Sequence, residues 1–141
     1  MAVLIDIADS VVAQLNGATL SQPVVAARYY QPRFGVEEMD ALHVSVVPRS
    51  ITNKTLDRTH DLFDYKIDMA IQKRCDGSLA AIDVLMDLVE EICDLFRSQP
   101  LLSFPGARCV EVQNDPVYAP EHLEELRQFT SLITLTFKVR S

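Results

Sequence analysis

The chain has 141 residues and a net charge of −7, with 48% hydrophobic and 23% charged residues. This length suits one domain with its own core, so we expect a single α+β domain over residues 1–141. The acidic balance argues against nucleic acid as the main partner, because phosphate binding relies on Lys and Arg. No basic leader segment and no apolar run of roughly 20 residues is present, which predicts a protein made in a cytoplasm, without a membrane partner.

The first part of the sequence predicts one helix and two strands. Apolar residues recur at helical spacing over about residues 2–15, and Asn16-Gly17 then favours a helix stop. Strands are expected at residues 24–30 and at about 39–47, where Leu42, Val44 and Val46 alternate with small or polar residues. Residues 48–61 are polar and include Pro48, so we expect a long loop there.

The next segment has the clearest periodic pattern of the chain. Over residues 62–73 every second residue is apolar, which predicts a strand with one face in the core and the other in water or against a partner. Asp76-Gly77-Ser78 predicts a turn and an N-cap for a main helix at about residues 79–98. Its expected core stripe consists of Leu79, Ile82, Leu85, Met86, Val89, Ile92, Cys93 and Phe96.

The last part predicts a strand at residues 107–113, a short helical piece within 118–126, and a long strand at 129–140. In that final strand, threonines and Lys138 lie opposite the apolar face. The order is α-β-β-β-α-β-β. It favours an α+β fold in which two helices pack on one face of a mainly antiparallel or mixed sheet of four to five strands.

No pattern of catalytic, cofactor-binding or metal-binding residues is found. His43, His60 and His122 lack a Cys, Ser or carboxylate at a catalytic spacing, and no glycine-rich phosphate-binding motif occurs. Cys75, Cys93 and Cys109 form no CxxC pair, so we expect buried free thiols. The sequence therefore predicts a protein that is not an enzyme.

Two segments resemble a known family. The strand DYKIDMAIQKR at residues 64–74 runs into a long amphipathic helix, and the chain ends in the threonine-rich strand LITLTFKVR at residues 132–140. With the N-terminal helix, the strand pair and the polar loop, this order resembles the tail terminator (tail completion) proteins of tailed bacteriophages. The likeness covers nearly the whole chain and lies in the order of the elements and the pattern of polar and apolar residues. It extends to related phage neck and head–tail joining proteins.

The resemblance implies a virion structural protein that forms a ring, usually a hexamer. Such a ring caps the tail tube, ends tube growth and presents a surface to the head–tail connector or stopper protein. It implies no catalytic residues, no cofactor, and no contact with nucleic acid beyond DNA passing through the ring. Two alternatives stay open: another neck component, such as a head–tail adaptor or stopper, and a small ligand-binding or enzymatic α+β domain with a pocket lined by His43 or the acids of the main helix.

Two charged groups are candidates for contacts between subunits. Closed rings need an interface in which one patch meets a different patch on the neighbour. The acidic face of the main helix contains Asp83, Asp87, Glu90, Glu91 and Asp94. The expected loop contains Arg49, Lys54 and Arg58. The alternatives are that both groups are simply solvated, that the acids bind a divalent cation, or that the loop faces the lumen or the tube.

Overall fold

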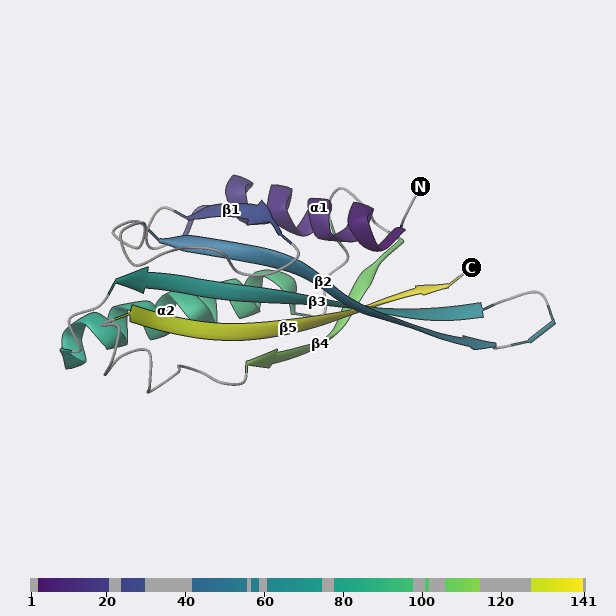
Figure 1. The fold of residues 1–141 in the computed structure, drawn as a ribbon. Coiled ribbons are helices and arrows are strands. Elements are labelled where there is room, and N and C mark those ends of the chain that lie inside the picture. The colour runs from purple at the N-terminus through teal and green to yellow at the C-terminus, as the bar shows by residue number, and fades with distance from the viewer. Residues whose placement is uncertain are drawn as a thin grey trace.

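The elements follow the order that the sequence predicts. The computed structural model describes residues 3–20, 24–29, 42–55, 57–58, 61–74, 78–97, 101, 106–114 and 128–140. Its elements are α1 (Val3–Gly17), β1 (Val25–Arg28), β2 (His43–Thr55), β3 (Asp61–Arg74), α2 (Leu79–Phe96), β4 (Arg108–Asn114) and β5 (Gln128–Arg140) (Figure 1). The five strands form one mixed sheet in the order β1-β2-β3-β5-β4, with β1 parallel to β2 and the other pairs antiparallel. The α+β prediction is confirmed.

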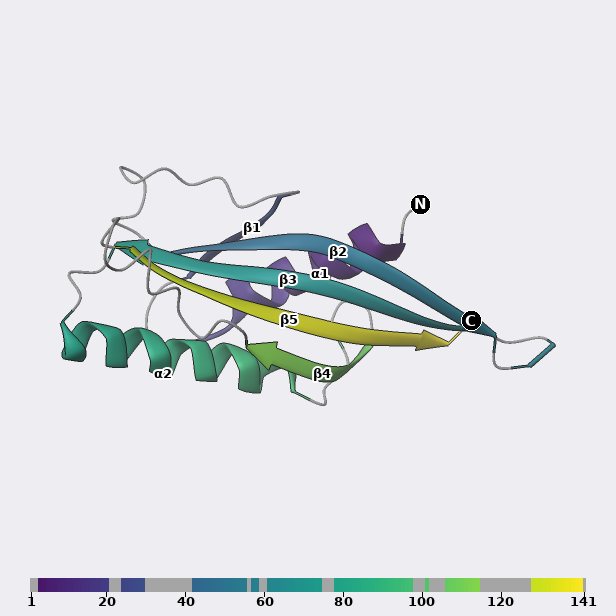
Figure 2. The same cartoon turned by 60° about the horizontal axis from the view of Figure 1, so that its bottom comes forward.

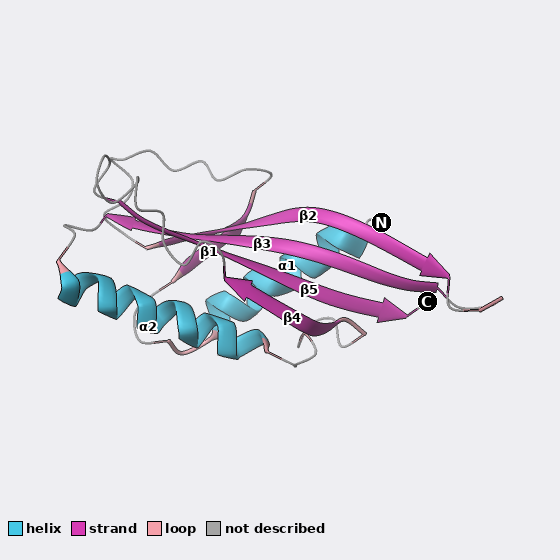
Figure 3. Cartoon of the chain, turned by 90° about the horizontal axis from the view of Figure 1, so that it is seen from below, coloured by secondary structure: helices cyan, strands magenta, loops and turns pink. Residues whose placement is uncertain are grey.

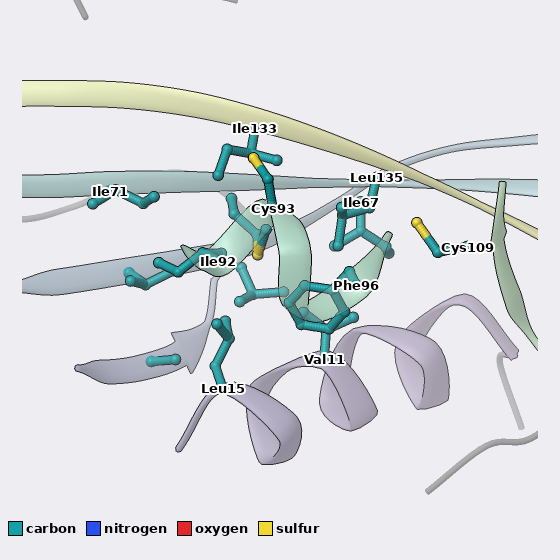
Figure 4. Close-up of a cluster of buried hydrophobic side chains, with 14 of the residues drawn as sticks. Val11, Leu15, Ile67, Ile71, Ile92, Cys93, Phe96, Cys109, Ile133 and Leu135 are labelled. Carbon is teal, nitrogen blue, oxygen red and sulfur yellow. The ribbon is translucent and has the colours of Figure 1, made fainter. Parts of the chain in front are cut away.

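Both helices lie on the same face of this sheet (Figures 2 and 3). The register brings apolar residues of neighbouring strands onto that face, with Met69 opposite Ile133 and Ile67 opposite Leu135. Side chains from α1, α2, β3 and β5 gather in one cluster between the layers (Figure 4). The core is therefore a helix layer packed on one side of a sheet, as the period-2 and period-3.6 patterns predict.

Polar side chains fix the first helix to the first strand. Asn16 at the end of α1 donates to the carbonyl oxygen of Ala26 at 3.0 Å and accepts from the Ala26 N–H at 2.9 Å. Arg28 donates from Nε to Asp9 Oδ1 at 2.7 Å. Because Asn16 satisfies both backbone groups of Ala26, it occupies part of the outer edge of β1, which would otherwise be unpaired.

The core stripe expected for the main helix needs two corrections. Leu88 is fully buried, although the stripe omits it. Leu79 was expected in the core stripe but is 81% exposed. The reason is positional, since the first turn of α2 extends past the ends of β3 and β5, where no sheet covers it (Figure 2). The short helical piece expected within 118–126 lies outside the described residues.

The loop predicted at residues 48–61 is wrong for residues 48–55, which form a strand, whereas residues 56, 59 and 60 lie outside the described residues. β2 continues through Thr55 and pairs with β3 along its whole length, with Ile51 opposite Tyr65 and Thr55 opposite Asp61. A bulge between Pro48 and Ser50 accommodates the proline, which strands tolerate at an open edge or a bulge. The strong pairing pattern of β3 thus imposes strand geometry on a polar segment whose own composition favours a loop.

Candidate assembly surfaces

The distal ends of β2 and β3 form an arm. We define the arm as residues 50–55 of β2, residues 57–58 of the turn and residues 61–64 of β3. The far ends of β2 and β3 project past both helices, at the opposite end of the molecule from the first turn of α2 (Figures 1 and 2), while at the base of the arm Phe63 still packs against the core. Residues 51–55 of β2 are all exposed, whereas Val44, Ser45 and Val46 near its start are buried. One strand therefore passes from the core into a solvent-exposed extension.

The arm exposes both apolar and basic groups. Ile51 is 54% exposed, which is unusual for an isoleucine in a paired strand. Lys54 and Arg58 are exposed, and within the described ranges neither forms an ion pair. Lys54 points to the opposite face of the ribbon from Ile51, because they are three residues apart in a strand, and Arg58 lies in the turn. Lys54 and Ile51 are therefore presented on different faces, and the arm also carries Asp57, Asp61 and Asp64 beside its two cations.

Arg49 belongs to a different environment from Lys54 and Arg58. It occupies the bulge of β2, and its Nη1 lies 3.5 Å from Asp68 Oδ1 and 3.4 Å from Thr134 Oγ1. Thr134 in turn donates to Asp68 Oδ1 at 2.7 Å. Arg49 therefore takes part in a three-residue network across β2, β3 and β5. The structure separates it from the two arm cations with which the sequence grouped it.

The acidic face of α2 is present, and its members differ in their surroundings. Asp83, Asp87, Glu90 and Asp94 are exposed, and Glu91 is half-buried. Asp94 forms an ion pair with Arg97 at 2.9 Å, so its charge is partly balanced within the helix. Asp83 and Asp87 form no ion pair with any described residue. Glu90 likewise forms no ion pair with a described residue, so the uncompensated negative charge extends from Asp83 to Glu90.

Two exposed apolar residues accompany these acids. Leu79 is 81% exposed and Val84 is 54% exposed. Leu79, Asp83 and Asp87 are spaced by four residues and so lie along one line of the helix, with Val84 beside them. The sequence did not predict this patch, because Leu79 fitted the core stripe and Val84 fitted neither face. The only available sign was that Val84 breaks the apolar period.

The sheet face opposite the helices is polar yet partly withdrawn from solvent. Ser45, Gln72, Thr134 and Thr136 lie on this face and are buried. The side-chain oxygens Ser45 Oγ, Gln72 Oε1 and Thr136 Oγ1 have no hydrogen-bond partner among the described residues. The prediction that β5 carries its threonines away from the core is confirmed by the register. The sheet face opposite the helices is therefore polar but not fully exposed to solvent.

The described residues offer little for catalysis. Cys93 and Cys109 are buried free thiols, as predicted, while Cys75 lies outside the described residues. Burial raises the pKa of both thiols, to about 11 for Cys109, so neither is a thiolate nucleophile at neutral pH. Within the described ranges, no group of three or more His, Cys, Asp or Glu side chains is arranged to hold a metal ion. His43 begins β2 opposite Gln72, while His60 and His122 lie outside the described residues.

In the described part of the chain, no helix is both long and apolar enough to cross a bilayer.

Comparison with known proteins gives a likeness of fold. No family model matches the sequence, and no curated protein matches it. Among solved structures, the chain is similar to a chain of the virion of a native gene transfer agent particle, with a TM-score of 0.57, 14% identity, and coverage of 95% of this chain and 92% of that chain. It is also matched to the sheath/tube terminator of an extracellular contractile injection system, with a TM-score of 0.48 and 17% identity; 97% of this chain aligns with 56% of that chain.

The resemblance expected from the sequence is thus confirmed at the level of fold. The chain has a fold found in a component of a phage-like particle, over nearly the full length of both chains. The arm and the outward face of α2 are among the exposed surfaces of this fold.

Proposed function

We propose that the chain is a tail terminator subunit of a phage or phage-like particle. In this role, identical copies form a ring, a hexamer by analogy with the family, that caps the tail tube and ends its growth. The other side of the ring presents a surface to the head–tail connector or stopper, and DNA passes through the centre. The protein is made in the host cytoplasm and works in the virion, with no catalytic step.

The observation that carries this proposal is the agreement of two independent likenesses. The sequence resembles tail terminators in element order and in its two long strands, and the fold is similar to a chain of a gene transfer agent virion over nearly all of both chains. Two exposed surfaces of different composition, the arm and the outward face of α2, lie at opposite ends of the molecule. Contacts between two different surfaces are head-to-tail contacts, which close into rings when the rotation allows it.

The position of the protein on isolated particles tests the proposal. An epitope-tagged chain is expressed in the cells that produce the particles, and headless tails and tailless heads are purified separately. Gold label at one end of headless tails is the expected result. Label along the whole tube, or on neither particle, would contradict the proposal.

A second expected result concerns tube length. Cells that lack the chain should make tubes of uneven length, longer than those of the parent, because nothing ends polymerisation. Tubes of normal, uniform length would count against a terminator.

The same labelling separates the alternative role in the neck. A head–tail adaptor or stopper would be found on tailless heads and be missing from headless tails. The fold likeness is compatible with this alternative, since the matched virion chain is described only as part of the particle.

A further inference from the structure

The sheet has a free strand edge on each side. On one side β1 pairs with β2 only as far as Val46, so among the described residues 47–55 have a strand partner on one side alone. On the other side β4 is the last strand, and the described part of the chain pairs residues 108–113 with β5 only (Figure 3). Unpaired strand edges pair with another chain unless they are covered or interrupted. The two free edges are therefore candidate contact surfaces.

These free edges lie level with each other along the strands. The pairs that cross the sheet at one end of β4 are Thr52 with Asp64, Asp64 with Lys138, and Lys138 with Arg108. Corresponding pairs at its other end link Val47 to Gln113. β4 therefore stands at the same height as residues 47–52 of β2, and β1 ends before that height is reached. A strand placed beside this part of β2 would not meet β1.

Each free edge also carries one exposed β-branched apolar residue at the same height. Ile51 of β2 is 54% exposed, and Val110, at the bulge of β4, is 47% exposed. Ile51 is linked through Tyr65 and Phe137 to Cys109, which directly precedes Val110. Branched apolar side chains in strands are stabilised by packing against side chains of a neighbouring strand. A contact between the two edges would give Ile51 and Val110 such neighbours.

We propose that the free edge of β2 in one copy pairs with β4 of the next copy, so that the sheet continues between subunits. This inference rests on the proposed ring and names the strands that build it. β4 runs opposite to β2, because three antiparallel pairs lie between them. Rotation about an axis parallel to the strands keeps their directions, so the new pair is antiparallel as well. The contact joins two different edges, and such contacts can close into a ring.

The register assigns the backbone groups that would form this pair. In antiparallel strands the N–H and C=O groups of successive residues point to alternate sides. The carbonyl oxygen of Val46 accepts from Tyr29 on the β1 side at 2.9 Å. The β3 partners of Ile51 and Asn53 are separated from that of Val46 by an even number of residues, so both N–H groups point outward. The same alternation, carried through β3 and β5, gives Val112 of β4 an outward N–H.

Proline substitutions test the proposal, because proline removes one N–H and is tolerated on a strand edge where that N–H points outward. Asn53→Pro blocks the free edge of β2, and Val112→Pro blocks that of β4. Their matched controls, Asn53→Thr and Val112→Thr, keep the N–H. Val110→Lys is a second β4 variant; its side chain is already 47% exposed, so it should fold as the parent does. Thermal melting checks the folding of every variant.

Association is measured by chemical cross-linking, on purified copies at high concentration and on isolated tails. Each edge variant alone should give roughly tenfold less cross-linked product than its control, because a ladder hydrogen bond is lost and the proline ring obstructs the neighbouring strand. A purified mixture of Asn53→Pro and Val112→Pro copies should form dimers that do not grow. In that dimer the intact β4 of the first copy pairs with the intact β2 edge of the second.

Three results would overturn the inference, and each leads to a different conclusion. If the edge variants associate as well as their controls, the two edges do not form the contact, and the proposed function stands. If both β4 variants, Val112→Pro and Val110→Lys, still associate with themselves, the contact does not use β4. If the mixture gives no dimers, the two edges do not pair with each other.

Failure of the proposed function gives a different pattern. Parental copies that never associate, either at high concentration or on isolated tails, would remove the proposed ring itself, and the inference with it.

Discussion

The two halves of β2 show how one strand can serve two purposes. Near its start, Val44 and Val46 are fully buried under the helix layer, opposite Ile71 and Met69 of β3. Beyond the bulge, residues 51–55 are exposed, although they are paired with β3 in the same way. Pairing with β3 thus continues through both halves, but only the start of β2 also pairs with β1 and is buried. We infer that the covered half holds the fold together, and that the arm adds little stability and is available for assembly.

The largest expected effect is in the buried core of the sheet. Phe137 on β5 is fully buried, opposite Tyr65 and Cys109. The change Phe137→Ala should lower the free energy of unfolding by about 3–5 kcal/mol, because it removes an aromatic side chain and leaves a cavity. Urea denaturation followed by circular dichroism measures this loss. A loss below 1 kcal/mol would contradict the burial of Phe137 in the core that stabilises the fold.

A matched pair of substitutions compares the two halves directly. Val46→Thr puts a hydroxyl into the buried half and should cost about 1–3 kcal/mol of unfolding free energy. Ile51→Thr makes a similar change on the arm and should shift unfolding by less than about 0.5 kcal/mol, since the side chain is already half in water. Equal losses from the same urea titrations would erase the difference between the halves.

The link between α1 and the edge of the sheet has an intermediate expected effect. Asn16→Ala leaves the N–H and the carbonyl of Ala26 without their side-chain partner. We expect a loss of about 1–3 kcal/mol in unfolding free energy, the usual cost of unpaired, partly buried polar groups. Hydrogen exchange should become faster at Ala26 and stay unchanged in β5. Unchanged exchange at Ala26 would show that another group satisfies this edge.

A further expected effect appears only at high pH. Burial raises the pKa of Cys109 from 9.0 to about 11. The native state therefore holds this proton more tightly than the unfolded state, so its contribution to stability is complete below pH 9 and is lost as the pH rises toward 11. Thermal melts of the parent and of Cys109→Ala between pH 8 and 11 should show a steeper decline for the parent. Parallel curves would contradict the burial of a protonated thiol.

The sequence predicts the covered half better than the arm, for a physical reason. In β3 and β5 the side-chain period records which face meets the core, so the element order, strand faces and helix placement follow from it. Residues 48–55 show no such alternation of apolar and polar side chains, because most of them are exposed on either face. Their strand form depends on pairing with β3. For the same reason the exposed patch of Leu79 and Val84 could not be found: a leucine at the first turn of a helix fits the core period whether or not a sheet lies beneath it.

The charged residues show the same limit. The sequence identified Lys54, Arg58, Asp83 and Asp87 as candidates for an interface, and they remain so. It could not separate them from Arg49 and Asp94, because only the fold brings Arg49 to Asp68 and only the helix end brings Asp94 to Arg97.

Hydrogen–deuterium exchange on the free and the assembled protein tests the account most directly. In the free protein, the outward-facing amides of Val47–Thr55 lack a strand partner among the described residues and should exchange quickly. On assembly these amides and those on the free edge of β4 should become protected, while the buried start of β2 should change little. Unchanged exchange along the arm would contradict the claim that the arm is a part of this fold that is used for assembly.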